Sequence, residues 1–463
     1  MNASWRTEQS IRDLKAEVKK VGREKKGLLI ELRHQLKIKD PAEKKTQDKE
    51  KEGQEKESKE EDKPVAEKKK GKKRGAPIGH KGKSRSVPSK VDATDVVHAP
   101  DQCDCGCCNI LELEESDDKY IEDILAVVKT VTKVRYLRGK CTECGKIIRS
   151  KDALHGPPVI IGPNMASLLT MLRQKGMTFG NLSSLSTDMF DIPITRSGVL
   201  GIINRSVDKM EPAYDVIEYQ VPKEMVLHGD ETGWKIRRDA GYIWIFCNKN
   251  LVYFHHEKSR AGQVVKDILG EDYNGTCVCD FYGAYNVLKN TQRCLVHFLK
   301  DIKKQCEIYK GSKHLRTFKE RFKDFIKCGV EVQAMTNSNK KDKKVKLLSD
   351  ELDSIAEIKL PKGEPQNLRK RIINFKKQML LFVSNPEVEY HNNRAERHLR
   401  PMVISRKNSF GSDTEEGAKR MCILHSVIET CKLHNIQPFY FIQKIIKEDL
   451  NIHKTISIPL LHI

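Results

Sequence analysis

The feature that most constrains this fold is a change in the spacing of apolar residues near Val221. Upstream of this point, apolar residues recur every three or four positions, which is typical of helices. Downstream, they gather in short runs of strand length separated by turn residues. We expect strands at 223–228, 242–247, 251–256, 276–279 and 291–297, with a helix at 260–269 between the third and fourth strands.

Acidic residues follow two of these predicted strands. The first strand runs into a Gly-Asp-Glu-Thr stretch that contains Asp230, and the fourth ends at Asp280. Three strands, a helix and two further strands, with an aspartate after the first and after the fourth, is the order of an RNase H-like core. The sequence therefore predicts a multidomain α/β protein with such a core at 221–299 and 386–463.

A third carboxylate is expected from a later helix. Glu396 lies in a helical stretch, and Asn393 precedes it by about one turn, where it is expected to orient the carboxylate. Arg397 and Arg400 follow, and both are candidate contacts for DNA phosphates. Glu389 is the alternative acid, although Pro386 nearby indicates that the helix is only beginning there.

These three acids suit phosphodiester chemistry. Mg²⁺ prefers hard oxygen ligands and retains some water, so a few carboxylates on adjacent elements suffice to hold it. Two such ions about 4 Å apart activate an attacking oxygen and stabilise a leaving one at phosphorus. Asp230, Asp280 and Glu396 are therefore the candidate catalytic residues and the candidate ligands of two Mg²⁺ ions.

The composition agrees with a nucleic-acid partner. Lys and Arg number 85 against 64 Asp and Glu, a formal net charge of +21, which favours a polyanionic partner. Ribosomal and membrane-surface proteins share this bias. The 14 cysteines do not resemble a disulfide scaffold. Since the sequence shows no apolar signal core and no run long enough to cross a bilayer, we expect a cytoplasmic protein without a membrane partner.

The N-terminal residues predict a zipper and a basic arm. In 1–39, apolar residues from Ile11 to Leu32 follow the seam of a coiled coil, so a homo-oligomer is expected; the alternative is a single amphipathic helix. Residues 40–90 form a charged linker with too little apolar area to fold. The linker ends in a glycine-rich basic run, which suits a phosphate backbone or a minor groove, or is solvated linker charge. Its candidate DNA contacts are Arg74, His80, Lys81 and Arg85.

A cysteine cluster predicts a zinc ribbon at 91–155. Cys141 and Cys144 form a C-x-x-C knuckle, with Gly145 where the chain must turn tightly. Cys105 and Cys108 have the spacing of a second knuckle, but Cys103 and Cys107 are alternatives. Four thiolates would make a closed structural Zn²⁺ site. The residues between the knuckles, 124–137, alternate enough to be a hairpin.

The next region, 156–220, predicts a helix-turn-helix-like domain. Helices are expected at 165–172 and 179–189, and a third is expected from Thr195 through Val207. Pro193 forbids continuity between the last two helices, and Thr195 is a good N-cap. Arg196 near the start of the third helix is a candidate DNA contact. Plain helical packing gives the same pattern.

Four stretches resemble one known family. They are HGDETGW at 228–234, CDFYGAY at 279–285, NNRAER at 392–397 and KNSFGS at 407–412. Together they resemble the insertion sequence 66 family of transposases, which are DDE recombinases. The resemblance implies that Asp230, Asp280 and Glu396 are the catalytic triad. It extends to the zipper, the arm around His80 and the cysteine knuckles, although the irregular first knuckle and His391 depart from the pattern.

The resemblance implies a transposase that binds the terminal inverted repeats of its element and, with Mg²⁺, cleaves 3′ ends and transfers them to target DNA. Accessory proteins of the same element are a further candidate class of partner. Cys294-Leu295-Val296-His297 resembles a C-x-x-H element of several DDE families, which makes His297 a candidate accessory catalytic residue. Residues 300–385, with helical stretches at 300–328, 340–358 and 367–382, are expected to be an all-helical insertion.

Two other functions fit part of the pattern. A DNA-binding regulator with a zinc ribbon and a helix-turn-helix would explain the charge and the N-terminal half, but not the acids at the strand ends. An RNase H-like nuclease would use the same acids to cut nucleic acid without joining it to a target.

Overall fold

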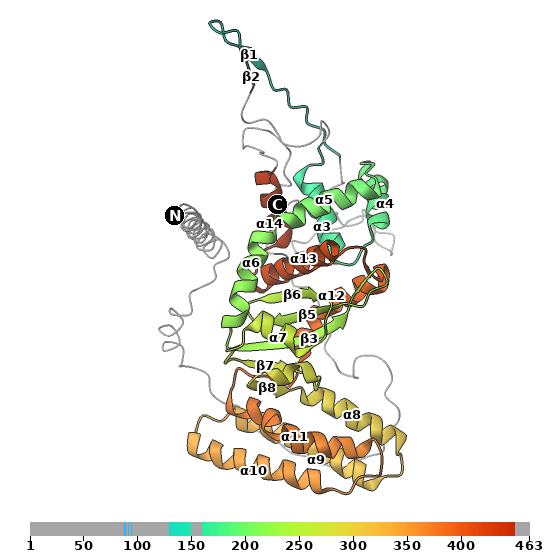
Figure 1. Ribbon diagram of the computed structural model, residues 1–463, viewed down its shortest axis with the longest axis vertical. Coiled ribbons are helices and arrows are strands. Elements are labelled where there is room, and N and C mark those ends of the chain that lie inside the picture. The colour runs from blue at the N-terminus through green and yellow to red at the C-terminus, as the bar shows by residue number, and fades with distance from the viewer. Residues whose placement is uncertain (1–87, 89–90, 92–93, 95–128, 150–159, 450–463) are drawn as a thin grey trace, which may run out of the picture. The chain divides into compact units, whose positions relative to one another are not determined.

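The computed structural model describes residues 129–149 and 160–449, together with Pro88, Val91 and Thr94 (Figure 1). The predicted zipper, the charged linker and the first cysteine knuckle lie outside the described residues, as do four of the candidate DNA contacts. They stay predictions. These four contacts are Arg74, His80, Lys81 and Arg85, and the knuckle residues are Cys105 and Cys108.

A five-stranded mixed sheet forms the centre of the fold, in the order β6-β5-β3-β7-β8. Adjacent strands β3, β5 and β6 pair antiparallel, whereas β7 pairs parallel with both β3 and β8. The sheet carries consecutive buried apolar side chains because helices cover it. Its strands are β3 Val226–Gly233, β5 Tyr242–Cys247, β6 Val252–Glu257, β7 Thr276–Cys279 and β8 Asn290–Arg293, with α7 Gly262–Leu269 between β6 and β7.

The predicted element order is confirmed, but two strand boundaries were wrong. The first strand begins at Val226, since Val221–Lys223 forms a short 3-10 helix (η1), and it continues through Asp230 to Gly233. The last strand ends at Arg293, and helix α8 (Leu295–Ile308) starts two residues later. The expected strand 291–297 therefore contains a strand and the first turn of a helix, two elements that a short apolar run does not distinguish.

In the described part of the chain, four helices precede the sheet. Thr195 caps the third of them as predicted, because its side chain accepts a hydrogen bond from the Gly198 N–H at 3.1 Å. Asp191 ends the second helix in the left-handed conformation, with a φ of 51°. The four helices are α3 Pro163–Gln174, α4 Phe179–Phe190, α5 Arg196–Asp208 and α6 Glu211–Gln220.

A set of helices follows β8 and has an apolar core of its own, which includes Phe298, Phe322 and Phe382. The predicted helical stretch 300–328 is divided between α8 and α9, because the chain leaves the helix at Tyr309 and starts again after Ser312, whose side chain caps α9. The helices after α8 are α9 Lys313–Gln333, α10 Ser338–Glu357 and α11 Pro365–Ser384.

Of the last three helices, two return to the sheet and the third returns to the helices that precede it (Figure 1). Helix α12 (Asn393–Ser409) packs against β3, α13 (Glu415–Leu433) packs against β6, and α14 (Pro438–Asp449) packs against α3. A small parallel pair joins β4 (Lys235–Ile236) to β9 (Gly411–Ser412). No helix in the described part of the chain has the length and apolar character needed to span a membrane.

A separate small hairpin is formed by β1 (Arg138–Lys140) and β2 (Ile147–Arg149). The hairpin expected at 124–137 was wrong for its described part, since 129–137 contains no strand. The strands flank the knuckle instead of preceding it. They are short, and the turn that connects them carries Cys141 and Cys144.

Helix α13 is buried on nearly all sides, and it carries a histidine into the core. His425 is fully buried against Phe254, and neither ring nitrogen has a hydrogen-bond partner in the described structure. Burial lowers the pKa of His425 to about 3. Between pH 6.5 and 3, His425 therefore binds a proton in the unfolded chain but not in the folded chain. The free energy of unfolding decreases as the pH falls through this window.

We expect His425→Leu to remove this loss. Each pH unit in the window corresponds to about 1.4 kcal/mol for one such group. The free energy of unfolding of the variant minus that of wild type should therefore be about 2 to 3 kcal/mol larger at pH 4.5 than at pH 7.5, measured by urea unfolding at both pH values. His314→Gln, at an exposed position of α9, is the matched control and should show no such gain. An equal difference between His425→Leu and wild type at the two pH values would contradict the prediction.

Candidate active site

The strand register brings the two predicted aspartates to the same level of the sheet. Strands β3 and β7 pair in parallel with Leu227 opposite Cys277 and His228 opposite Val278. Two residues further along, where the two strands separate, the same register sets Asp230 beside Asp280. Neighbouring residues in register project from the same face of a sheet, so both carboxylates lie on one face at the ends of the parallel strands, and both are half-buried.

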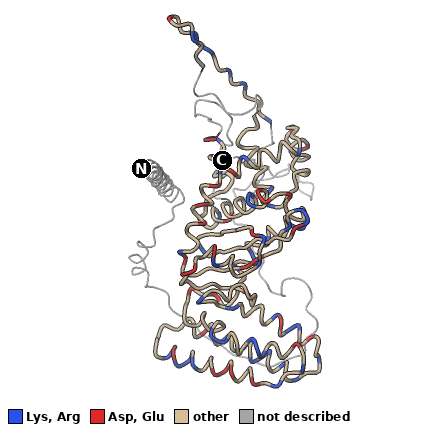
Figure 2. The backbone as a smooth tube through the Cα atoms, in the orientation of Figure 1, with Lys and Arg blue, Asp and Glu red and all other residues tan. Residues whose placement is uncertain are grey.

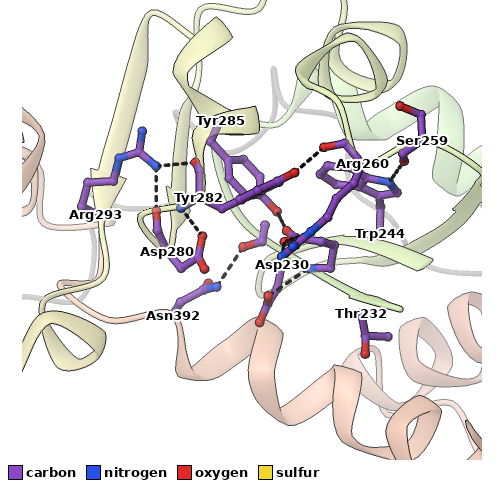
Figure 3. A network of polar contacts seen from close by, with 12 residues as sticks. Asp230, Thr232, Trp244, Ser259, Arg260, Asp280, Tyr282, Tyr285, Arg293 and Asn392 are labelled. Carbon is purple, nitrogen blue, oxygen red and sulfur yellow. Dashed lines mark hydrogen bonds and ion pairs between the residues drawn. The ribbon is translucent and has the colours of Figure 1, made fainter. Parts of the chain in front are cut away.

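A buried arginine fixes the turn that carries Asp280 (Figure 3). The Arg293 guanidinium donates hydrogen bonds to the carbonyl oxygens of Asp280 at 2.7 Å and Tyr282 at 3.2 Å, and the Asp280 carboxylate accepts the Tyr282 N–H at 2.8 Å. These bonds hold the backbone, and only one of the two Asp280 carboxylate oxygens accepts a hydrogen bond within the described residues. Arg293 was not among the residues predicted from the sequence, although a charged residue in an otherwise buried strand is a signal that it is needed there.

Glu231, the carboxylate next to Asp230 in the sequence, is hydrogen-bonded to other side chains. Glu231 projects to the opposite face, where it accepts hydrogen bonds from Arg260 at 2.6 Å and from the Tyr285 hydroxyl at 2.8 Å. Tyr282 in turn donates to the Arg260 carbonyl at 2.8 Å (Figure 3). This network ties β3 to the segment after β7, so Glu231 supports the site and is not available as a ligand.

Asn392 positions the helix that carries the third acid. It is fully buried before the first turn of α12, and its side chain donates to the Gly229 carbonyl at 2.8 Å. Its side-chain oxygen lies 3.2 Å from His228 Nδ1, and its backbone N–H donates to the Cys294 thiol at 3.2 Å. Because burial lowers the pKa of His228 to about 4, the ring is neutral and donates through Nδ1.

Asn393, the predicted orienting residue, is the first residue of α12 and is half-buried. The buried hydrogen bonds at the start of this helix are made by its neighbour Asn392, and the orienting role of Asn393 stays a prediction. The two neighbours have the same side chain, so only their positions relative to the helix start, which propensity does not fix, distinguish them.

Glu396 faces the first turns of α8. Its Oε1 lies 3.3 Å from His297 Nε2, and its Oε2 lies 3.8 Å from Lys300 Nζ. Glu396 Oε1 is buried and makes no hydrogen bond of good geometry. Cys294, His297 and Glu396 have potential metal-ligating atoms within 4.8 Å of one another, and this is the one such group of three in the described part of the chain. Burial, however, raises the pKa of the Cys294 thiol, whose sulfur already accepts the Asn392 N–H.

The site concentrates negative charge. Burial, together with the nearby carboxylates of Glu231, Asp280 and Glu396, raises the pKa of Asp230 to about 7. Glu389, the alternative third acid, lies outside this group: burial opposes its ionisation, but the hydrogen bond from Arg394 at 2.7 Å and the neighbouring histidines hold its pKa below the usual value. Glu389 is thus neutralised by its own partners, whereas the charge around Asp230 is not.

The second cysteine knuckle has the local geometry that a metal site uses. The Gly145 N–H donates to the Cys141 carbonyl at 3.0 Å, and Gly145 adopts a φ of +70°, as its position in the tight turn requires. Hydrogen bonds from the backbone of Cys144 and Glu143 lower the pKa of Cys141. The thiolate, which is the form that binds Zn²⁺, is therefore favoured at Cys141.

The candidate DNA contacts within the described residues are exposed. Arg196 starts α5 and lies over Gly180 of α4. Arg397 and Arg400 lie on α12 in the turn after Glu396. None of the three forms an ion pair with a carboxylate of the described chain, so their charges are available to an external anion.

Comparison with known proteins assigns the family. A model described as "Transposase IS66 family" matches residues 159–420, which is more than half of the chain. The chain belongs to the IS66 family of transposases. The matched range includes the sheet, α8 to α12 and all three candidate acids. Family membership implies that the protein is a transposase and binds DNA.

One curated relative is also similar. "Uncharacterized protein y4hP" of Sinorhizobium fredii (strain NBRC 101917 / NGR234) is 22% identical over 391 residues, which are 74% of this chain and 69% of that protein. Its name gives no activity, so the assignment to the IS66 family rests on the family match.

We expect Asp230→Asn to stabilise the metal-free protein. The pKa of Asp230 is raised in the folded state, so ionisation of this carboxyl destabilises the fold increasingly as the pH rises from 3.8 to 7. Asparagine keeps the oxygen that accepts the Glu231 N–H and carries no charge. In EDTA, Tm should rise by about 5 °C at pH 8 and by less at pH 5.

Asp239→Asn, at the exposed tip of the β3–β5 hairpin, serves as the control and should leave Tm unchanged at both pH values. A lower Tm for Asp230→Asn at pH 8 would show that the Asp230 carboxylate stabilises the metal-free fold.

Proposed function

We propose that this transposase is a DDE recombinase that cleaves the 3′ ends of its element and transfers them to target DNA with Mg²⁺. The observation that carries the proposal is the register of β3 and β7, which sets Asp230 beside Asp280 on the face that Glu396 of α12 also approaches. The strand order, with three antiparallel strands followed by two parallel ones, supports an RNase H-like core.

The residues at the site fit a divalent cation. Three carboxylates from three elements influence one another, Glu396 Oε1 is buried and makes no hydrogen bond within the described structure, and burial together with these carboxylates raises the pKa of Asp230. Asp230, Asp280 and Glu396 would hold Mg²⁺ ions, whose hard oxygen preference they match. When bound, such ions lower the barrier to attack at phosphorus by stabilising both the attacking and the leaving oxygen.

The surrounding residues have separate roles in this proposal. Asn392 anchors the start of α12 to β3 and so sets where Glu396 lies, while Arg293 holds the turn of Asp280. His297 approaches Glu396 and would fix the orientation of its carboxylate. The exposed Arg397 and Arg400 would bind the phosphates on either side of the cleaved bond.

DNA recognition is assigned to the N-terminal half. We infer that the zinc ribbon, the basic arm and the α4–α5 pair bind the terminal inverted repeats, with Arg196 at the start of the second helix of the pair. The N-terminal zipper would pair two subunits, one at each end of the element. Separate recognition and catalytic parts would let DNA ends be held in place while the scissile phosphate enters the acidic site.

The two rival functions make different products. A regulator would bind the element's ends and leave them intact, and a nuclease would cut them without joining. A regulator does not need three acids that face one site, and a nuclease would use the same acids without joining the ends. The recombinase is preferred because the chain belongs to a family of transposases.

The decisive test compares wild type and Glu396→Gln in a cleavage and strand-transfer assay with Mg²⁺, on DNA that carries the element's own ends. We expect joined products from wild type and a loss of about a thousand-fold in the variant, since several kcal/mol of transition-state stabilisation depend on the ligand. DNA binding should persist in Glu396→Gln. Glu389→Gln is the matched control and should retain joining.

The other possible outcomes would each support one of the alternative interpretations. Joining that survives Glu396→Gln and is lost in Glu389→Gln would make Glu389 the third acid. Cut ends that are never joined would identify a nuclease, and binding without cleavage would favour the regulator.

We further predict that the isolated protein contains about one zinc ion per chain, held in part by Cys141 and Cys144. Cys141→Ser should lower the zinc content, measured by atomic emission, because the knuckle loses a thiolate. Cys328→Ser, at an exposed single cysteine of α9, should not. Cys294→Ser should also leave zinc in place. Loss of zinc from Cys294→Ser would locate the ion at the Cys294–His297–Glu396 group instead.

A further inference from the structure

An exposed aromatic ring stands at the end of α12 that is opposite to Glu396. Phe410 follows the last residue of the helix, and its side chain is 80% exposed. A single exposed apolar side chain on a loop is ordinary. This one is unusual because the backbone that presents it is strained and tightly bonded to its surroundings.

The strain lies at Phe410 itself. Its φ is +58°, in the left-handed region that non-glycine residues rarely occupy. The backbone N–H of Phe410 donates to the Arg406 carbonyl at 2.7 Å, and the next residue, Gly411, lies so close to β4 that a Cβ there would be 2.0 Å from the Lys235 carbonyl oxygen. Strain of this kind persists only where the surrounding structure imposes it, and it is typical of functional segments.

The surrounding bonds connect this segment to the catalytic strand. The Arg406 guanidinium donates to Thr232 Oγ1 and to the Gly233 carbonyl, both at 2.8 Å. Ser412 accepts the indole N–H of the buried Trp234 at 3.0 Å. Because Thr232 and Gly233 belong to β3, Phe410 is presented on the same rigid framework that holds Asp230.

A line of exposed residues leads along α12 from Glu396 to the ring. Arg397, Arg400, Ile404 and Lys407 are all exposed, at steps of three, four and three residues, and Phe410 continues the series three residues later. This spacing keeps them on one face of the helix. Neither the two arginines nor Lys407 pairs with a carboxylate in the part of the chain that the structure describes. At 1.5 Å per residue, the helix carries this face about 20 Å from Glu396.

The neighbouring hairpin adds to the positive charge. Lys235, Arg237 and Arg238 are exposed beyond β3, and the Arg237 N–H donates to the Ser412 carbonyl at 3.0 Å. Figure 2 shows Lys and Arg gathered where α12 ends. An aromatic ring among cations that form no ion pair within the described residues matches single-stranded nucleic acid, whose phosphates bind the cations and whose bases stack on the ring. A second copy of so basic a surface would be repelled.

We propose that Phe410 is the stacking platform for an unpaired base of the bound DNA, and that the exposed cations of α12 carry the backbone from Glu396 to that base. The inference rests on the proposed function, since it takes DNA at Glu396 as its starting point. Stacking on a ring is tolerant of sequence because every base has a π-face. Phe410 would therefore hold a DNA strand in position without reading which base it carries.

The test uses the full chain and two probes, a fully paired duplex and the same duplex with a short unpaired bubble in which one base is 2-aminopurine. We expect Phe410→Ala to weaken binding of the bubble about ten-fold, to leave binding of the paired duplex within about two-fold, and to abolish the quenching of 2-aminopurine fluorescence. Phe410→Trp should restore both properties. Ile373→Ala, at a position of α11 that is 62% exposed, is the control and should resemble wild type.

Other results would overturn the inference in distinguishable ways. If wild type binds both probes and Phe410→Ala binds them equally well, the stacking role is wrong while the transposase mechanism stands. If Phe410→Ala instead changes the oligomeric state in sedimentation, the ring packs against a second copy of the chain. If wild type binds neither probe, both the stacking role and the proposed function are contradicted.

Discussion

The side-chain amide of Asn392 is the contact on which the site depends. The three acids come from a strand, the end of a second strand and a helix far along the chain, and backbone pairing fixes only the first two. Asn392 bonds to Gly229 through its side chain and to Cys294 through its backbone N–H, so it joins β3, the start of α8 and the start of α12 at one buried point. Since it has no exposure to water, loss of any of these bonds would leave a buried polar group unpaired.

The electrostatics of the site follow from the same arrangement. Arg293 and Arg260 neutralise the surroundings of the acids without reaching the Asp230 carboxylate: Arg293 bonds to backbone carbonyls and Arg260 to Glu231. The cations on α12 point outward to solvent. Negative charge is therefore concentrated where a metal would bind, and positive charge where DNA would lie, which separates the two kinds of ligand within one small region.

The sequence predicted the strand order correctly, because buried strands have local signals, and the strand-end aspartates were candidates on the same local pattern. Three features had no such signal. The course of β3 through Asp230 depends on pairing with Tyr242–Cys247, a contact between distant residues. The anchoring role of Asn392 depends on where the helix starts, and the importance of Arg293 depends on a turn that only the folded chain forms. The break at Tyr309 was likewise hidden within a continuous helical pattern.

The chain leaves the sheet at the start of α8 and returns to it just before α12, and these two points are close together. The Leu295 N–H donates to the Tyr390 carbonyl at 2.9 Å, so the two ends of this excursion are hydrogen-bonded to each other beside the site. Gln333 closes the same junction by donating to the carbonyls of Asn385 and Val388. In evolutionary terms, the distal ends of the helices between α8 and α12 can lengthen, shorten or acquire new surfaces while the distance between His297 and Glu396 stays the same. The geometry of the candidate site is thereby insulated from changes at the distal ends of these helices.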